Sequence, residues 1–140
     1  MQKKTIAIFG MVTAIVAASP GPAPAQFSSR IQFEAGSDST AISGTITGRE
    51  YRDYVLRARA GQTMAVALTV DGTNGSGSAF FNILPPGSDN VAVHIGSMDD
   101  DSFASVELPE NGNYTIRVYL MGNDASTHKT TSFTVSVTIR

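Results

Sequence analysis

The chain has 140 residues, a formal net charge of −2 and no cysteine. It lacks the basic stripe that is typical of nucleic-acid binding, so nucleic acid is not an expected partner. Without cysteine there is neither a disulfide nor a thiol nucleophile, and a packed apolar core must hold the fold.

The first 25 residues have the layout of a secretory signal peptide. Two lysines precede an apolar run at residues 6–17, and an Ala-Pro-Ala cleavage motif follows at residues 23–25. The apolar run is too short for a membrane-spanning helix, which needs about 20 residues. We expect cleavage between Ala25 and Gln26, export without a lipid or membrane anchor, and one mature domain over residues 26–140.

The mature chain alternates apolar and polar residues in short runs separated by turn residues. This period of two is typical of strands that bury one face. We expect strands within residues 31–33, 41–47, 54–59, 64–68, 79–84, 91–95, 104–108, 114–120 and 133–139. With no helical periodicity, the pattern predicts an all-β fold, a two-sheet antiparallel β-sandwich of jelly-roll type with about eight strands.

The last two runs, 114–120 and 133–139, are long and rich in β-branched residues. We expect them to pair as a hairpin through the polar segment 122–129 and to bury one shared apolar face. Within the second strand, Gly44 indicates a bulge or a close backbone approach. The glycine- and serine-rich segment 71–78 is expected to be an exposed, mobile loop.

Residue types that carry catalysis are sparse. There is no nucleophile elbow and no histidine pair for zinc, and His94 is expected to be a structural side chain on the outer face of its strand. Asp99, Asp100 and Asp101 form a carboxylate cluster that could supply calcium ligands together with backbone carbonyls. The cluster lacks the alternating spacing and the glycine of a calcium loop, so a solvated turn is the default. We therefore expect that the protein is not an enzyme and that it binds neither a metal ion nor a cofactor.

Large polar side chains instead gather in two connections between strands. Arg49 and Tyr51 lie in one, and Asn123, His128 and Lys129 lie in the other. Loops on a rigid sandwich are where such folds bind partners, and Tyr and Arg are frequent anchors of protein interfaces. Tyr51 either anchors a partner or packs under its loop as a corner tyrosine; the sequence leaves both open.

A family resemblance rests on residues spread over the mature chain. They are Ser43-Gly44, Gly48, Tyr51, Tyr54, Ala60-Gly61-Gln62, Leu108-Pro109, Gly112, Tyr114, Arg117-Val118, Asn123-Asp124-Ala125 and Lys129. This pattern resembles the periplasmic inhibitors of goose-type (g-type) lysozyme. The Ala-Gly-Gln turn and the Pro-x-x-Gly-x-Tyr spacing are also similar to bacterial pre-peptidase C-terminal domains, which are β-sandwiches.

The first resemblance implies a periplasmic protein whose edge loops enter a lysozyme cleft and cover its catalytic carboxylate. It implies that partner contacts come from Arg49, Tyr51, Asn123, Asp124, His128 and Lys129, although Asn123 and Asp124 could instead shape the turn. It also implies a tyrosine after Gly48 and arginines on both sides of Asn-Asp-Ala. This chain has Arg49, Gly122 and Ser126 at those positions.

The second resemblance keeps an alternative open. It implies a non-inhibitory module that binds polysaccharide or another envelope protein, with calcium held at residues 99–101.

Overall fold

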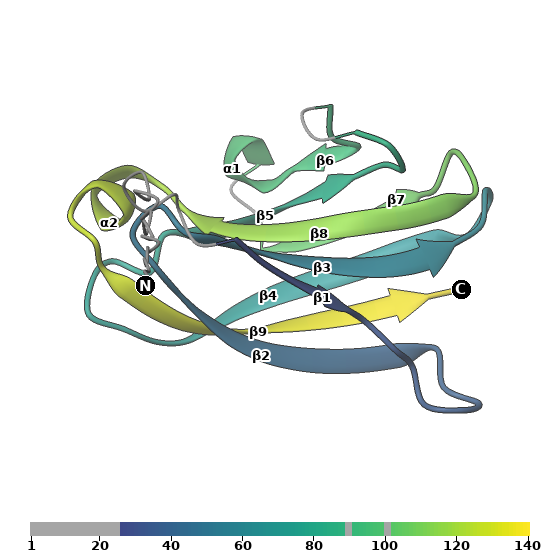
Figure 1. The fold of residues 1–140 in the computed structure, drawn as a ribbon, viewed down its shortest axis with the longest axis horizontal. Helices are drawn as coiled ribbons and strands as arrows, with labels where there is room; N and C mark the ends of the chain where they lie inside the picture. The colour runs from purple at the N-terminus through teal and green to yellow at the C-terminus, as the bar shows by residue number, and fades with distance from the viewer. Residues whose placement is uncertain (1–25, 89–90, 100–101) are drawn as a thin grey trace, which may run out of the picture.

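The chain folds as two β-sheets that face each other, as Figure 1 shows. The computed structural model describes residues 26–88, 91–99 and 102–140. These ranges contain nine strands and two short helices, which confirms the predicted all-β sandwich. No helix in them is long and apolar enough to cross a membrane.

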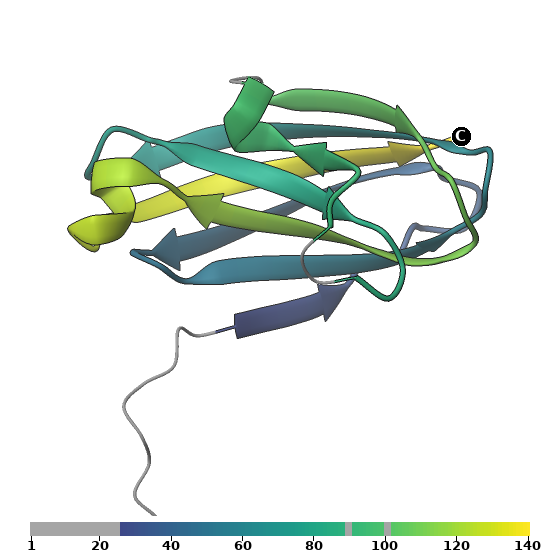
Figure 2. The same cartoon turned by 90° about the horizontal axis from the view of Figure 1, so that it is seen from above.

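One sheet has five strands and the other has four. The first contains, in spatial order, β1 (Gln26–Arg30), β3 (Tyr51–Ala58), β8 (Gly112–Leu120), β5 (Ala79–Leu84) and β6 (His94–Ile95). The second contains β2 (Ser39–Thr47), β9 (Thr130–Ile139), β4 (Thr63–Thr73) and β7 (Phe103–Glu107). All pairings between these strands are antiparallel except that of β1 with β3, where β1 forms the outer edge (Figure 2).

The core lies between the sheets and is built from alternate residues of the central strands. Period-two alternation turns one face of each strand inward, so the polar residues between the buried ones face out. The fully or nearly fully buried residues include Met64, Val66 and Leu68 on β4, Tyr114, Ile116, Val118 and Leu120 on β8, and Phe133, Val135 and Val137 on β9. The predicted inward faces of these three strands are confirmed.

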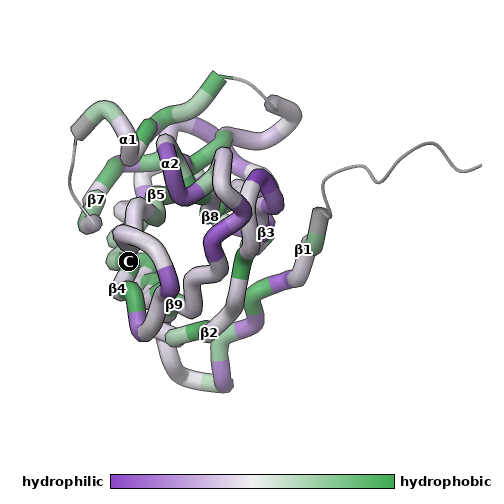
Figure 3. The backbone as a smooth tube through the Cα atoms, turned by 90° about the vertical axis from the view of Figure 1, so that its left-hand side faces the viewer, coloured by the Kyte–Doolittle hydropathy of each residue, from purple (hydrophilic) through white to green (hydrophobic). Residues whose placement is uncertain are grey.

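The predicted hairpin of the last two strands is wrong. β8 pairs with β3 and β5, whereas β9 pairs with β2 and β4, so the two strands lie in opposite sheets (Figure 3). Their connection contains the helix α2 (Gly122–Ser126) and is longer than the turns that usually close hairpins. Alternation specifies which face is buried but not which strand lies alongside. Stacked face to face, both strands bury their apolar rows.

His94 is also placed differently from the prediction. The strand expected over 91–95 is reduced to β6, and His94 lies opposite Ile83 and therefore on the same, inward side of the sheet. Its ring packs on Phe81 with 5.1 Å between ring centroids. The register of β6 on β5 thus turns the imidazole toward the core. After β6, the chain forms the four-residue helix α1 (Gly96–Asp99), which is too short to leave a periodic signal in the sequence.

A buried tyrosine fixes the turn before β8. The Tyr114 hydroxyl donates to the Glu110 carbonyl oxygen at 2.7 Å and accepts from the Glu110 N–H at 3.0 Å. The predicted turn at Ala60-Gly61-Gln62 is tied to the same region, since the Gly61 N–H donates to the Leu108 carbonyl. Tyr114, rather than Tyr51, is therefore the corner tyrosine of this sandwich.

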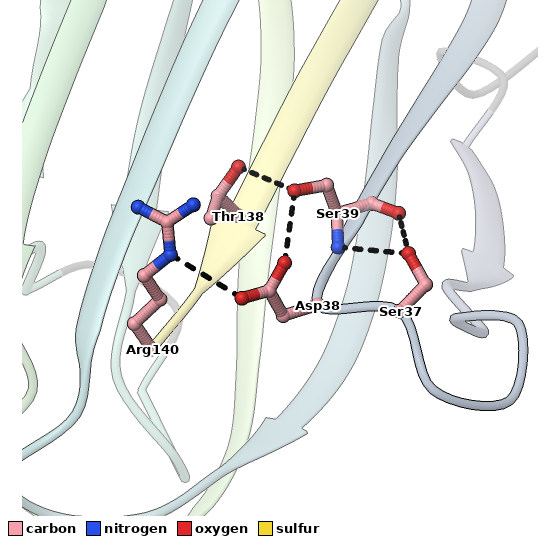
Figure 4. Close-up of polar contacts among 5 residues, drawn as sticks. All are labelled: Ser37, Asp38, Ser39, Thr138 and Arg140. Atoms are coloured by element: carbon pink, nitrogen blue, oxygen red, sulfur yellow. Dashed lines mark hydrogen bonds and ion pairs between the residues drawn. The ribbon is translucent and has the colours of Figure 1, made fainter.

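The edge pair β2–β9 is joined on its outer face by side-chain hydroxyl groups. Hydrogen bonds link Ser39 to Thr138 at 3.0 Å, Ser43 to Thr134 at 3.2 Å, Thr45 to Ser132 at 3.4 Å and Thr47 to Thr130 at 2.9 Å. Figure 4 shows the first of these beside the ion pair of Asp38 with Arg140. Cross-strand pairs of this kind contribute to the pairing of antiparallel strands.

Gly44 makes the close approach that the sequence predicts. A Cβ atom at this position would lie 2.6 Å from the Tyr54 hydroxyl oxygen and 2.8 Å from Cζ of Phe133. Both side chains belong to the core, so there is little room to move. We expect Gly44→Ala to lower the free energy of unfolding by about 1–3 kcal/mol, the usual cost of overpacking a core.

Urea unfolding monitored by circular dichroism measures this change. Gly72→Ala is the matched control, because a Cβ atom at Gly72 meets nothing within 4 Å. Equal stability of the two variants would show that the sheets separate at Gly44 without cost.

Candidate functional site

Three connections gather at the end of the sandwich that is opposite the C-terminus (Figure 1). They join β2 to β3, β4 to β5, and β8 to β9. We call residues 48–50, 74–78 and 121–129 the rim; Figure 3 looks onto this end of the molecule, where α2 is labelled. Two of its three segments are those in which the sequence predicts partner contacts. The third belongs to the segment 71–78, for which the sequence predicts an exposed, mobile loop; residues 71–73 are instead the end of β4.

The first and last segments of the rim are bound to each other. The Gly48 N–H donates to the Lys129 carbonyl oxygen at 2.9 Å. Gly48 has a φ of +63°, and a Cβ atom there would lie 2.7 Å from Nδ1 of His128. His128 itself has a φ of 57°, which a residue other than glycine rarely adopts. The two turns therefore fit together closely, and Arg49 projects from their junction.

Asp124 joins the middle segment to α2. It is 1% exposed, and its two carboxylate oxygens accept the N–H groups of Ser76 at 2.9 Å and Ser78 at 2.8 Å. These hydrogen bonds hold the pKa of Asp124 below its ordinary value, with a smaller contribution from the charge of Lys129 and against the opposing effect of burial. The segment 74–78 is thus tied to the rim by a buried carboxylate.

The remaining predicted contact residues lie at or next to the rim surface. Arg49, Asn123 and His128 are exposed, and Lys129 is half-buried. Asp124 differs, because its carboxylate accepts hydrogen bonds within the rim and holds two of its segments together. Of the two alternatives for this residue, the turn-shaping one matches its position.

Tyr51 stands at the start of β3, beside the rim, with its ring under a guanidinium group. The Arg117 Cζ atom lies 4.2 Å from the ring centroid. Arg117 also donates to both carboxylate oxygens of Asp53, at 2.8 and 2.9 Å. A stacked, doubly bonded arginine is held rigidly, and arginine on an aromatic ring is a frequent interface element.

Sequence reasoning did not place Arg117 in the site. The signal was present, because alternation in the run 114–120 puts Arg117 and Tyr119 on the outward face opposite the buried Ile116 and Val118. Tyr119 lies directly opposite Tyr51 and donates to Asn82 Oδ1 at 2.7 Å. The outer face of the five-stranded sheet therefore continues the rim with aromatic and guanidinium groups.

Two positions in the last segment of the rim lack the arginines that the family resemblance implies, and both lie on the surface. Gly122 and Ser126 are exposed at the first and last positions of α2. Gly122 has a φ of +62°, a backbone conformation that favours glycine over arginine. The local backbone is thus compatible with the loss of the arginine that the family resemblance implies at this position.

The calcium hypothesis at residues 99–101 falls largely outside the described residues, since Asp100 and Asp101 are not among them. Within the ranges that are described, no group of three His, Cys, Asp or Glu side chains is placed to hold a metal ion.

The chain is similar to known inhibitors of lysozyme. A protein of Escherichia coli K12 described as an inhibitor of g-type lysozyme is 31% identical over 111 residues, which is 79% of each chain. No family model matches the sequence.

Solved structures give the same result. The periplasmic inhibitor of g-type lysozyme from Aeromonas hydrophila, PliG, is 31% identical, with a TM-score of 0.72 over 82% of this chain and 97% of that one. PliG of Salmonella Typhimurium is 25% identical, with a TM-score of 0.63 over 81% and 98%. The pre-peptidase C-terminal domain of a Bacillus anthracis collagenase, at 14% identity and a TM-score of 0.53 over 82% of this chain and 96% of that one, shares the fold alone.

The anchoring role of Asp124 predicts a pH-dependent effect of Asp124→Asn. We expect the variant to melt at a lower temperature at neutral pH, because an amide has one oxygen to accept the two N–H groups. A carboxyl with a lowered folded pKa adds stability above its ordinary pKa and loses it as the pH falls through the folded value. The gap between wild type and variant should therefore shrink in acid.

Melting curves from pH 7 down to pH 2–3 measure this gap. Asp71→Asn is the charge-matched control, since the exposed Asp71 accepts one hydrogen bond from Thr134. A gap that stays constant with pH would contradict the role assigned to the buried carboxylate.

Proposed function

The chain belongs to the family of g-type lysozyme inhibitors, and we propose that it binds a g-type lysozyme and closes the enzyme's cleft with its rim. In this proposal residues 1–25 are a signal peptide cleaved between Ala25 and Gln26. Residues 26–140 then act in the periplasm as a single, non-enzymatic domain.

The observation that carries the proposal is the balance of charge on the rim. Both of its acidic side chains are used internally: Glu50 Oε1 accepts the Thr47 N–H at 2.9 Å, and Asp124 binds Ser76 and Ser78. Arg49 is exposed, and no hydrogen bond or ion pair of its side chain occurs among the described residues. The rim therefore presents a guanidinium group that is paired with neither of these carboxylates.

Such a group suits a cleft that works with a carboxylate, as the family resemblance implies for the lysozyme. A guanidinium fork can donate two parallel hydrogen bonds to one carboxylate. We infer that Arg49 takes the central position, where the family pattern has a tyrosine. Tyr51, Asn123, His128 and Lys129 would make the surrounding contacts.

The rim is also well prepared for binding. Its three segments are held to one another by main-chain and buried carboxylate hydrogen bonds, so little freedom remains to be lost on association. Preorganisation of this kind raises affinity by lowering the entropic cost of binding. Arg117, stacked on Tyr51, extends the same rigid surface onto the sheet.

An inhibition assay against goose-, chicken- and invertebrate-type lysozymes tests the proposal. We expect inhibition of the goose type alone. Arg49→Ala should weaken it roughly thirtyfold, as the loss of a hot spot worth about 2 kcal/mol would. Arg57→Ala, an exposed arginine of β3 at the opposite end of the sandwich, is the matched control and should inhibit as well as wild type.

Two results would count against the proposal. Absence of inhibition of any goose-type enzyme at micromolar concentration would remove the function. Inhibition that Arg49→Ala leaves intact and Arg57→Ala abolishes would place the lysozyme contact at the end of the molecule opposite the rim.

A further inference from the structure

A groove of about 520 Å³ lies at the end of the sandwich opposite the rim. It is formed where the segment between β1 and β2 passes the end of β3, and its volume falls within the range of about 300–1,000 Å³ usual for small-ligand sites. Phe33, Ala58 and Ile139 supply an apolar lining. None of these residues belongs to the rim, so the groove is a separate feature.

The polar part of the groove consists of hydrogen-bond donors. Arg57 and Arg59 are exposed, and among the described residues neither side chain has a hydrogen bond or an ion pair. The amide oxygens of two further lining residues are already occupied. The Arg59 N–H donates to Gln62 Oε1 at 2.7 Å, and the Ala60 N–H donates to Asn111 Oδ1 at 2.8 Å.

These main-chain bonds decide which end of each amide remains for a ligand. Because a backbone N–H needs an acceptor, the oxygens of Gln62 and Asn111 are held inward and their NH₂ groups are left to donate. The groove thus offers two guanidinium groups and two amide NH₂ groups.

The one acidic side chain that lines the described groove does not cancel this surplus. Asp38 accepts hydrogen bonds from the Ser39 hydroxyl at 3.2 Å and from Arg140 Nε at 3.3 Å, as Figure 4 shows. Its carboxylate is ion-paired with Arg140, which does not line the groove, and the groove keeps two guanidinium groups for this one carboxylate. A ligand that complements the groove must bring acceptors, negative charge and an apolar group.

We propose that this groove binds the C-terminal end of a short peptide whose last side chain is apolar. The carboxylate pairs with Arg57 and Arg59, whose planar forks match it. The preceding peptide carbonyls accept from Gln62 and Asn111, and the apolar side chain covers Phe33 and Ile139. This activity is independent of the rim and of the function proposed above.

The test is an NMR titration of the full exported protein with acetyl-Ala-Ala-Leu as the free acid. We expect saturable shifts of the Gln62 and Asn111 side-chain NH₂ signals. The peptide with a C-terminal amide should bind at least about tenfold more weakly, because it lacks the charge. Arg57→Gln and Arg59→Gln should each weaken binding of the acid to a similar degree, whereas Arg49→Gln on the rim should not.

Each contrary outcome overturns the inference. The absence of saturable shifts at millimolar peptide would show that the groove does not bind a peptide C-terminus. Equal binding of acid and amide would remove the carboxylate from recognition. Inorganic phosphate binding as tightly as the peptide acid would show that the groove attracts charge alone.

Discussion

The apolar inner rows of β8 and β9 must be buried, and they pack against each other between the two sheets. Both are central strands, one in each sheet, so their stacking forms the middle of the core. Since the two strands follow each other in the chain, the segment between them must pass from one sheet to the other. That crossing, with α2 in it, is what builds the last segment of the rim. The candidate site is therefore a direct product of how the core is closed.

A crossing segment of nine residues needs support, and Asp124 provides it. The carboxylate replaces water around the N–H groups of Ser76 and Ser78, which an apolar residue at this position would leave without acceptors. One acidic side chain thus turns a glycine-rich connection into part of a defined surface. The exposed Arg49 and the stacked Tyr51–Arg117 pair then sit on a frame whose shape does not depend on the partner.

Alternation in the sequence predicted most of the strands and the inward faces of β4, β8 and β9, and the glycine within β2 predicted the close approach at Gly44. The strand expected at residues 31–33 is wrong, because the first strand is β1 (Gln26–Arg30) and residues 31–33 lie outside it. Alternation could not predict that β8 and β9 lie in different sheets. A strand can bury its apolar face whether the next strand in the chain pairs with it or lies in the opposite sheet. The sequence likewise leaves open whether Asp124 contacts a partner or shapes the turn. A loop aspartate that is solvated and one that accepts main-chain N–H groups look alike in sequence, and the donors lie about 46 to 48 residues away. Likewise, the inward turn of His94 follows from the β5–β6 register, which no local pattern encodes.

The position of β9 has a consequence for how the protein is made. It is the last strand in chain order, yet it lies between β2 and β4, with Ser39 opposite Thr138. The four-stranded sheet cannot assemble until this final segment has been synthesised, and such distant pairings form slowly. A nascent chain of this protein therefore lacks its complete core until β9 has been made.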